Sequence, residues 1–160
     1  MLQEVRFLVI DDQAAIRQIV TEILRAAGAR WIDYATDGAS GLEAVRDKKP
    51  DIVIADVQMQ GMDGLDFVRL LRCAPDTPNP FLPVIMLTAH TDIGRVAMAR
   101  DVGVTEFASK PISAANLLQR INAVILRPRP FIRSESYFGP CRRRRVDERL
   151  AQQKRRKTDQ

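Results

Sequence analysis

The apolar residues of this chain form short continuous runs, separated by stretches in which they recur at helical spacing. Three of the runs are rich in β-branched residues, as strands buried on both faces of a sheet are, and two weaker runs complete the series. The predicted strands are 6–10, 31–35, 51–55, 83–88 and 106–109. The predicted helices lie between and after them, at 16–27, 38–48, 64–73, 92–102 and 113–125. Strand and helix therefore alternate throughout residues 1–126.

The first and last helices carry the clearest signals. Apolar residues from Ile16 to Ala27 fall on one face of a helix, and Gly28 follows where a C-cap is expected. The last helix has a similar stripe and begins at Ser113, a typical N-cap residue. The segment from Cys73 to Pro83 contains four prolines, Pro83 included, which predicts a stiff loop before the fourth strand.

Five strands that alternate with five helices predict an α/β fold, in which a parallel sheet is covered on both faces. Right-handed crossovers favour a doubly wound five-stranded sheet of order 2-1-3-4-5, which is the flavodoxin-like arrangement.

Four of the five predicted strands deliver a polar side chain at their carboxyl end. Asp11 and Asp12 follow the first strand, Asp56 follows the third, Thr88 ends the fourth and Lys110 follows the fifth. Ligands bind at this edge of an open parallel sheet, and strands 1 and 3 are neighbours in the order 2-1-3-4-5. We therefore expect the three carboxylates to converge, with Thr88 and Lys110 on one side of the same pocket.

Three carboxylates in one pocket repel each other unless cations lie among them. A divalent ion and the Lys110 ammonium can supply that charge, and a few hard oxygen ligands favour Mg²⁺, for which Mn²⁺ could substitute. A carboxylate placed beside these cations can attack phosphorus and form an aspartyl phosphate. Taken singly, each residue also has an ordinary role as a helix cap, a strand former or a solvated lysine. Their joint placement favours the pocket.

Several motifs in this order resemble the receiver domain of two-component response regulators, specifically the single-domain receivers of the chemotaxis type. The resemblance covers residues 4–126 and rests on LVIDDQ (8–13), DIVIADVQM (51–59), MDG (62–64), VIMLTA (84–89) and FASKP (107–111). It implies a receiver domain over residues 1–126.

The resemblance assigns a role to each member of the pocket. Asp56 matches the phosphoacceptor of the family. Asp11 and Asp12 match the acidic pair that holds Mg²⁺ together with Asp56 and the backbone carbonyl of Gln58. Lys110 matches the lysine that pairs with the phosphoryl oxygens.

The resemblance also implies a conformational switch. Thr88 matches the hydroxyl residue that contacts the phosphoryl group, and Ala89 the small residue that leaves room for it. Phe107 matches the aromatic residue that rotates inward as Thr88 moves, although a simple core aromatic is compatible with the same position. The Lys110–Pro111 peptide matches one that is cis in the family, as a bond before proline permits.

The chain departs from the family pattern in places. Gln60 stands where a proline is frequent, and Phe107 lacks the hydroxyl of the commoner tyrosine. Gln58 and His90 occupy positions that tune the lifetime of the phosphoryl group, with a sign that the sequence does not reveal. An exposed His90 without such a role is the more ordinary interpretation.

By resemblance, the chain is a phosphorelay module rather than an enzyme. It receives its phosphoryl group from a histidine kinase, a histidine phosphotransfer protein or a small donor such as acetyl phosphate, and changes its binding to an output protein through a face at roughly 92–126. One alternative is a phosphorylation-independent scaffold, which the complete set of five polar residues disfavours. Another is a phosphoester hydrolase, for which no substrate-specificity segment is evident.

Charge divides the chain into two unlike parts. Residues 1–126 hold 13 Lys/Arg and 16 Asp/Glu, a net charge of −3, whereas residues 127–160 hold 12 and 4, a net charge of +8. We expect residues 127–160 to be a basic, largely disordered tail. Two alternatives are a docking motif, with FIR (131–133) and YFGP (137–140) packing on a partner or on the receiver's own switching face, and a nucleic-acid contact through 142–145 and 154–157.

The chain contains neither a secretory signal pattern nor an apolar run long enough for a membrane helix. Its two cysteines, Cys73 and Cys141, lie far apart without metal-ligand spacing. Both features favour the reducing cytoplasm and argue against a membrane partner.

Overall fold

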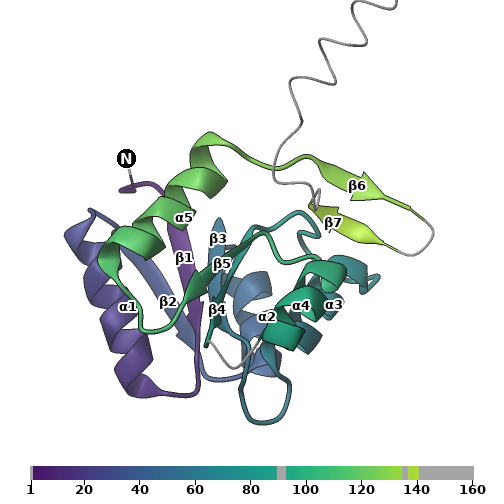
Figure 1. Ribbon diagram of the computed structural model, residues 1–160, viewed down its shortest axis with the longest axis horizontal. Coiled ribbons are helices and arrows are strands. Elements are labelled where there is room, and N and C mark those ends of the chain that lie inside the picture. Colours follow the sequence, from purple (N-terminus) through teal and green to yellow (C-terminus); the bar gives the residue numbers. More distant parts are fainter. Residues whose placement is uncertain (1, 90–92, 135–136, 141–160) are drawn as a thin grey trace, which may run out of the picture.

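The structure is a computed structural model that describes residues 2–89, 93–134 and 137–140 (Figure 1). Its centre is a five-stranded parallel sheet in the order β2-β1-β3-β4-β5, which confirms the predicted topology. The strands are β1 Arg6–Ile10, β2 Trp31–Ala35, β3 Ile52–Asp56, β4 Val84–Thr88 and β5 Glu106–Ser109. The third strand extends one residue further than its apolar run, so that Asp56 belongs to the strand itself.

Five helices cover the two faces of this sheet, as Figure 1 shows. On one face lie α1 Ala14–Ala26 and α5 Ala114–Leu126; on the other lie α2 Gly38–Lys48, α3 Gly64–Cys73 and α4 Ile93–Val102. The strands alternate between the two cores: Leu8 and Ile10 face α2 and α3, while Phe7 and Val9 face α1 and α5. A strand buried on both faces reads as an unbroken apolar run, which is why β1, β3 and β4 were evident in the sequence.

The helix ends follow ordinary capping chemistry. The Ser113 side chain accepts a hydrogen bond from the backbone N–H of Asn116, as an N-cap residue does. Gly28 and Gly103 follow α1 and α4 with φ of 98° and 103°, a left-handed conformation that glycine adopts at little cost. Among the described residues, no helix has both the length and the apolar character needed to cross a bilayer.

The segment after α5 differs from the disordered tail expected from residue 127 onward. The chain forms an antiparallel hairpin from β6 Phe131–Arg133 and β7 Phe138–Pro140. Phe131 and Phe138 pack with Phe81, whose ring centroid lies 5.1 and 5.6 Å from theirs. The aromatic residues of the tail are too few to form a core of their own, but the loop before β4 supplies the missing partner. Residues 141–160, and with them the predicted nucleic-acid contact, lie outside the described residues.

The start of α3 packs unusually closely on β3. The backbone N–H of Gly64 donates to the carbonyl of Val57, and a Cβ at this position would collide with the carbonyl oxygen of Asp56. Only glycine allows this approach, which brings the first turn of the helix against the strand that carries Asp56.

Substituting Gly64 by Ala should therefore destabilise the fold. We expect the free energy of unfolding to fall by about 1–3 kcal/mol, as for other overpacked sites, when measured by chemical denaturation. Gly94→Ala is the matched control, because Gly94 is exposed in α4 with open space around it, and should be neutral or stabilise by up to about 1 kcal/mol. Equal stability of Gly64→Ala and the unsubstituted chain would show that α3 can move away without cost.

Candidate functional site

The carboxyl ends of β1, β3, β4 and β5 meet at one edge of the sheet. The strand register places Ile10 beside Ala55, Asp56 beside Leu87 and Thr88 beside Ser109. The polar residues that end or follow these strands consequently lie at one level, as the sequence predicted. Asp11 and Asp12 come from β1, Asp56 from β3, and Lys110 from the end of β5.

Three carboxylates form a cluster at this edge. Asp11, Asp12 and Asp56 each place one oxygen so that the three atoms lie within 4.8 Å of one another. Asp11 is fully buried, Asp56 is 5% exposed and Asp12 is exposed to solvent. Such a cluster is typical of the Mg²⁺ site of receiver domains, with two carboxylates held by the fold and one open to water.

The two carboxylate oxygens of Asp11 differ in their hydrogen bonding. Its Oδ1 accepts a hydrogen bond of 2.9 Å from the backbone N–H of Gln13, whereas its buried Oδ2 has no hydrogen-bond partner. Burial raises the pKa of Asp11 to about 6; the Gln13 hydrogen bond opposes this rise, and the charge of Asp56 adds to it. A buried carboxylate oxygen without a donor, beside two further carboxylates, fits a hard divalent cation such as Mg²⁺.

The ammonium group of Lys110 places a positive charge beside the carboxylate cluster. Its Nζ lies 3.1 Å from Oδ1 of Asp56, and its backbone N–H donates to the carbonyl of Thr88 at 2.7 Å. The Lys110–Pro111 peptide is cis. Lys110 is thus tied to β4 through its backbone while its side chain reaches across to β3.

A cavity of about 340 Å³ opens over this cluster. Its lining combines residues predicted from the sequence with three that were not assigned to the site, Gln13, Met59 and Gln60. The full set is Asp12, Gln13, Asp56, Gln58, Met59, Gln60, Ala89 and Lys110. The lining is mostly polar, so the cavity suits a small charged group. Gln60, where a proline is frequent in the family, forms part of this wall.

Two positioning contacts were not anticipated from the sequence. Gln13 holds Asp11 through its backbone, and the Arg17 guanidinium donates to the backbone carbonyl of Asp11 at 2.7 Å. Both contacts involve a backbone atom, the N–H of Gln13 or the carbonyl of Asp11, and the type of a residue does not indicate what its backbone contacts. Arg17 belongs to α1, and only in the folded protein does this helix bring its side chain to the end of β1.

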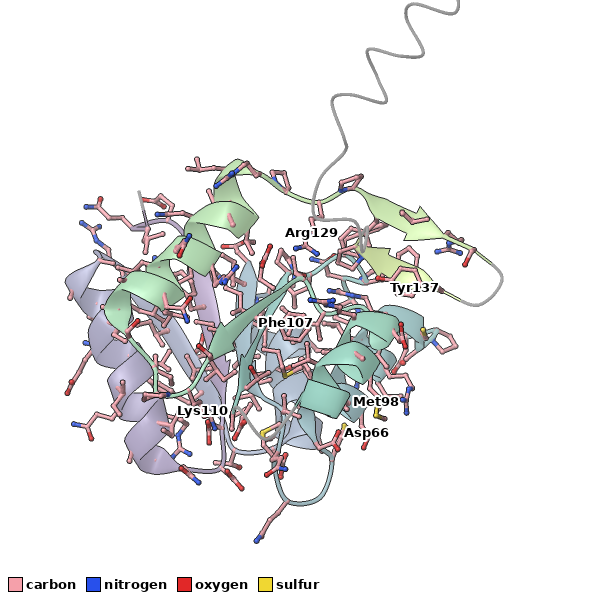
Figure 2. The ribbon with its side chains drawn as sticks, in the orientation of Figure 1. Asp66, Met98, Phe107, Lys110, Arg129 and Tyr137 are labelled. Carbon is pink, nitrogen blue, oxygen red and sulfur yellow. The ribbon has the colours of Figure 1, made fainter. Side chains whose placement is uncertain are left out.

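Neither of the predicted switch residues, Thr88 and Phe107, lines the cavity. Thr88 is almost buried at the end of β4, and its hydroxyl contact with a phosphoryl group stays a prediction. Phe107 is half-buried in β5, with the Arg100 guanidinium carbon 5.8 Å from the centre of its ring. Figure 2 shows Phe107 on β5 between the cavity end, marked by Lys110, and the opposite end of the strand. His90 lies outside the described residues.

Replacing Asp11 by Asn should expose the energetic cost of this site. The folded carboxyl has a pKa of about 6 and the unfolded one the ordinary value of 3.8, so the folded state is penalised above pH 6 and the penalty vanishes below pH 3.8. Without divalent ions, we expect Asp11→Asn to raise the free energy of unfolding by up to about 3 kcal/mol near about pH 8, and hardly at all below about pH 4.

Magnesium provides the second readout of this experiment. It should raise the thermal midpoint of the unsubstituted chain and of an Asp47→Asn control, which changes an exposed carboxylate on α2, but not that of Asp11→Asn. An Asp11→Asn variant that gained no stability at high pH, or that responded to magnesium like the control, would contradict this account of the site.

The sequence and the fold both match known proteins. Residues 7–122 match the family model described as the response regulator receiver domain. The DNA-binding response regulator MtrA of Mycolicibacterium paratuberculosis is 36% identical over 124 residues, which are 76% of this chain and 52% of MtrA. This chain therefore spans about half the length of that relative.

Solved structures show the same architecture. Chemotaxis protein CheY4 of Vibrio cholerae superposes with a TM-score of 0.68 at 32% identity, covering 75% of this chain and 98% of CheY4. A response regulator receiver domain protein of Clostridium thermocellum gives 0.69 at 30% identity, covering 77% and 95%. With the acidic pocket of Asp11, Asp12 and Asp56 at the carboxyl edge of its sheet, this chain belongs to the response regulator receiver domain family, the signalling modules of two-component systems.

Proposed function

We propose that Asp56 is the phosphoacceptor of a chemotaxis-type receiver, which changes its protein contacts when it carries a phosphoryl group. The observation that supports this most directly is the position of Asp56. Its carboxylate lies on the wall of the cavity, paired with Lys110 at 3.1 Å and within reach of the Asp11–Asp12 pair. A nucleophile, a fixed cation and a second cation site thus meet at one small polar cavity.

In this proposal Mg²⁺ is held by Asp11, Asp12, Asp56 and the backbone carbonyl of Gln58, and Mn²⁺ can take its place. When bound, the ion neutralises negative charge on the transferring phosphoryl oxygens. The buried, unpartnered Oδ2 of Asp11 supports this assignment, because the fold otherwise leaves that oxygen without compensation.

The residues of the chain supply the remaining parts of the transfer. One oxygen of Asp56 attacks phosphorus, while the bond from phosphorus to the imidazole nitrogen of a phosphohistidine breaks and its electron pair leaves with the imidazole. With acetyl phosphate the bond to oxygen breaks instead, and acetate leaves. Lys110 pairs with the phosphoryl oxygens, and Ala89 on the cavity wall leaves room for them. Attack of water on the aspartyl phosphate later returns Asp56 to its starting state.

The switch in this proposal begins at Thr88. Its hydroxyl moves to the new phosphoryl group, and Phe107 turns into the space that Thr88 leaves. The output surface then changes over α4, β5 and α5, residues 93–126 of the described chain. Binding of an output protein to one of the two arrangements shifts their populations by its difference in affinity.

Receiver domains are phosphorylated by histidine kinases, and for this chain we propose such a kinase or a histidine phosphotransfer protein as the donor. The DNA-binding character named for MtrA belongs to a protein about twice as long as the matched region. It forms no part of the function proposed for this chain, because the match covers only the receiver part.

Acetyl phosphate provides the direct test of this function. Incubation with Mg²⁺ should add the mass of one phosphoryl group per chain, and the adduct should be absent when Mg²⁺ is chelated. Asp56→Asn should abolish the adduct, because the amide is not a nucleophile toward phosphorus. The control Asp76→Asn changes an exposed aspartate that pairs with Arg46 and should be phosphorylated normally.

The outcomes separate the alternatives. Persistence of the adduct in Asp56→Asn would refute the assignment of the acceptor. No adduct in the unsubstituted chain, from acetyl phosphate or from a phosphorylated histidine phosphotransfer protein, would favour a scaffold that needs no phosphorylation. Many turnovers of a phosphoester by one chain would favour a hydrolase.

A further inference from the structure

The hairpin after α5 lies at the end of the sheet opposite the acidic cavity, and the proposed phosphoryl transfer does not use it. Besides packing on Phe81 in the loop before β4, it contacts three further parts of the receiver: α3, the turn between α4 and β5, and, through Arg129, the first residue of β5. Figure 2 shows Arg129, at the root of the hairpin, and Lys110 near opposite ends of β5, with Phe107 between them. The hairpin and the cavity thus share one strand.

The first contact is a buried arginine of α3. Arg72 is 3% exposed and donates to three backbone carbonyls, those of Gly103, Pro80 and Leu82, at 3.1, 2.9 and 2.6 Å. The ring of Phe131 in β6 lies 5.1 Å from the guanidinium carbon. A charged group at this depth is stabilised by the carbonyls and the aromatic face, so the hairpin forms part of its surroundings.

The second contact is a direct approach of two backbones. A Cβ on Gly139 in β7 would lie 2.9 Å from the Cα of Gly103, and one on Gly103 would lie 3.3 Å from the carbonyl oxygen of Phe138. The buried hydroxyl of Tyr137 donates to the carbonyl of Pro140 at 2.7 Å and stiffens this strand. β7 therefore packs directly on the turn that joins α4 to β5, with no room for an added methyl group on Gly139.

The third contact is an ion-pair network on β5 itself. The Glu106 side chain is nearly buried; one oxygen lies 3.0 Å from Arg129 at the root of the hairpin, and the other 3.6 Å from Arg120 of α5. Glu106 is followed directly by Phe107, the proposed switch residue, and β5 leads on to Lys110. Loss of Arg129 would remove the nearer of these two cations from a carboxylate that has little access to water.

From these contacts we propose that residues 127–134 and 137–140, which we call the C-terminal latch, favour the unphosphorylated arrangement of the receiver. The latch packs closely on the turn between α4 and β5, and its Arg129 pairs with Glu106 at the start of β5. Movement of α4 and β5 on phosphorylation strains these contacts. This inference rests on the proposed phosphorylation of Asp56.

Thermodynamic linkage makes the effect reciprocal. If phosphorylation loosens the latch, loosening the latch must favour occupation of the phosphoryl site by the same factor. A hairpin that only covered the end of the core would behave differently. Its loss would lower stability, but it would not change the affinity of the distant cavity.

The test uses beryllofluoride, a stable mimic of the phosphoryl group, titrated with Mg²⁺ into the full chain. We expect Arg129→Gln to bind it about 5-fold or more tightly than the unsubstituted chain, the lower end of typical coupling between sites. Arg129→Lys keeps the positive charge and should bind nearly as the unsubstituted chain does. Arg127→Gln, which changes an exposed arginine two residues away, is the control in the same segment.

Gly139→Ala provides a second variant that leaves the ion pairs intact. Its Cβ would lie 2.6 Å from the Tyr137 hydroxyl oxygen and 2.9 Å from the Cα of Gly103, so relief of both contacts moves β7 away from Gly103 and should tighten beryllofluoride binding in the same direction as Arg129→Gln. Hydrogen exchange in the unsubstituted chain gives an independent readout. Beryllofluoride should speed exchange at the amides of Ile132, Ser134 and Gly139, which face the partner strand in the hairpin register, while the centre of the sheet stays protected.

Two results would overturn the inference, and they can be told apart. If beryllofluoride binds at Asp56 with equal affinity in all variants and leaves exchange of the hairpin amides unchanged, the latch is refuted while the proposed function stands. If the unsubstituted chain binds no beryllofluoride and accepts no phosphoryl group, the proposed function fails and the latch fails with it.

Discussion

The burial of carboxylates beside one another is the constraint on which the organisation of this receiver depends. Asp11 and Asp56 are held by the ends of β1 and β3, where the fold removes most of their water. The raised pKa of Asp11 records the cost of this placement. Lys110 compensates part of the charge, and the unpartnered Oδ2 of Asp11 shows that the compensation is incomplete. A site that is unfavourable by itself favours the arrival of a cation, and a doubly charged phosphoryl group afterwards changes the balance again.

The rest of the fold keeps these charges from moving apart. Hydrogen bonds from Gln13 and Arg17 hold Asp11 in place, and the close contact of Gly64 with β3 fixes the strand that carries Asp56. The central strands are buried on both faces, so they cannot shift without disturbing two cores at once. The rigid centre leaves the edge strand β5 and the neighbouring α4 as the elements best suited to respond, because only part of their surface is packed.

The latch adds a constraint at the other end of this responsive edge. Glu106 begins β5 and Lys110 follows it, so a contact at one end and a charge change at the other act on the same four-residue strand. In this way an extension beyond the receiver sheet becomes part of its conformational equilibrium, although it lies far from the phosphoryl site.

The sheet order and most of the polar cavity follow from the order of residues along the chain. Unbroken apolar runs mark strands buried on both faces, and parallel strands bring their carboxyl ends to one edge. The order of residues along the chain is therefore enough to place Asp11, Asp12, Asp56 and Lys110 together. This logic works because the period of the side chains and the handedness of the crossovers are local rules.

Contacts that depend on backbone atoms, or on residues distant in the chain, emerge only in the folded protein. Gln13 supports Asp11 through a backbone N–H. The three carbonyls that accept from Arg72 come from two separate loops. The identities of these residues do not indicate either contact. Phe131 and Phe138 are too few to form a core of their own. The hairpin packs on the receiver because Phe81 adds a third aromatic ring to Phe131 and Phe138, and because the Arg72 guanidinium lies over the Phe131 ring. These residues come together only after the sheet has formed.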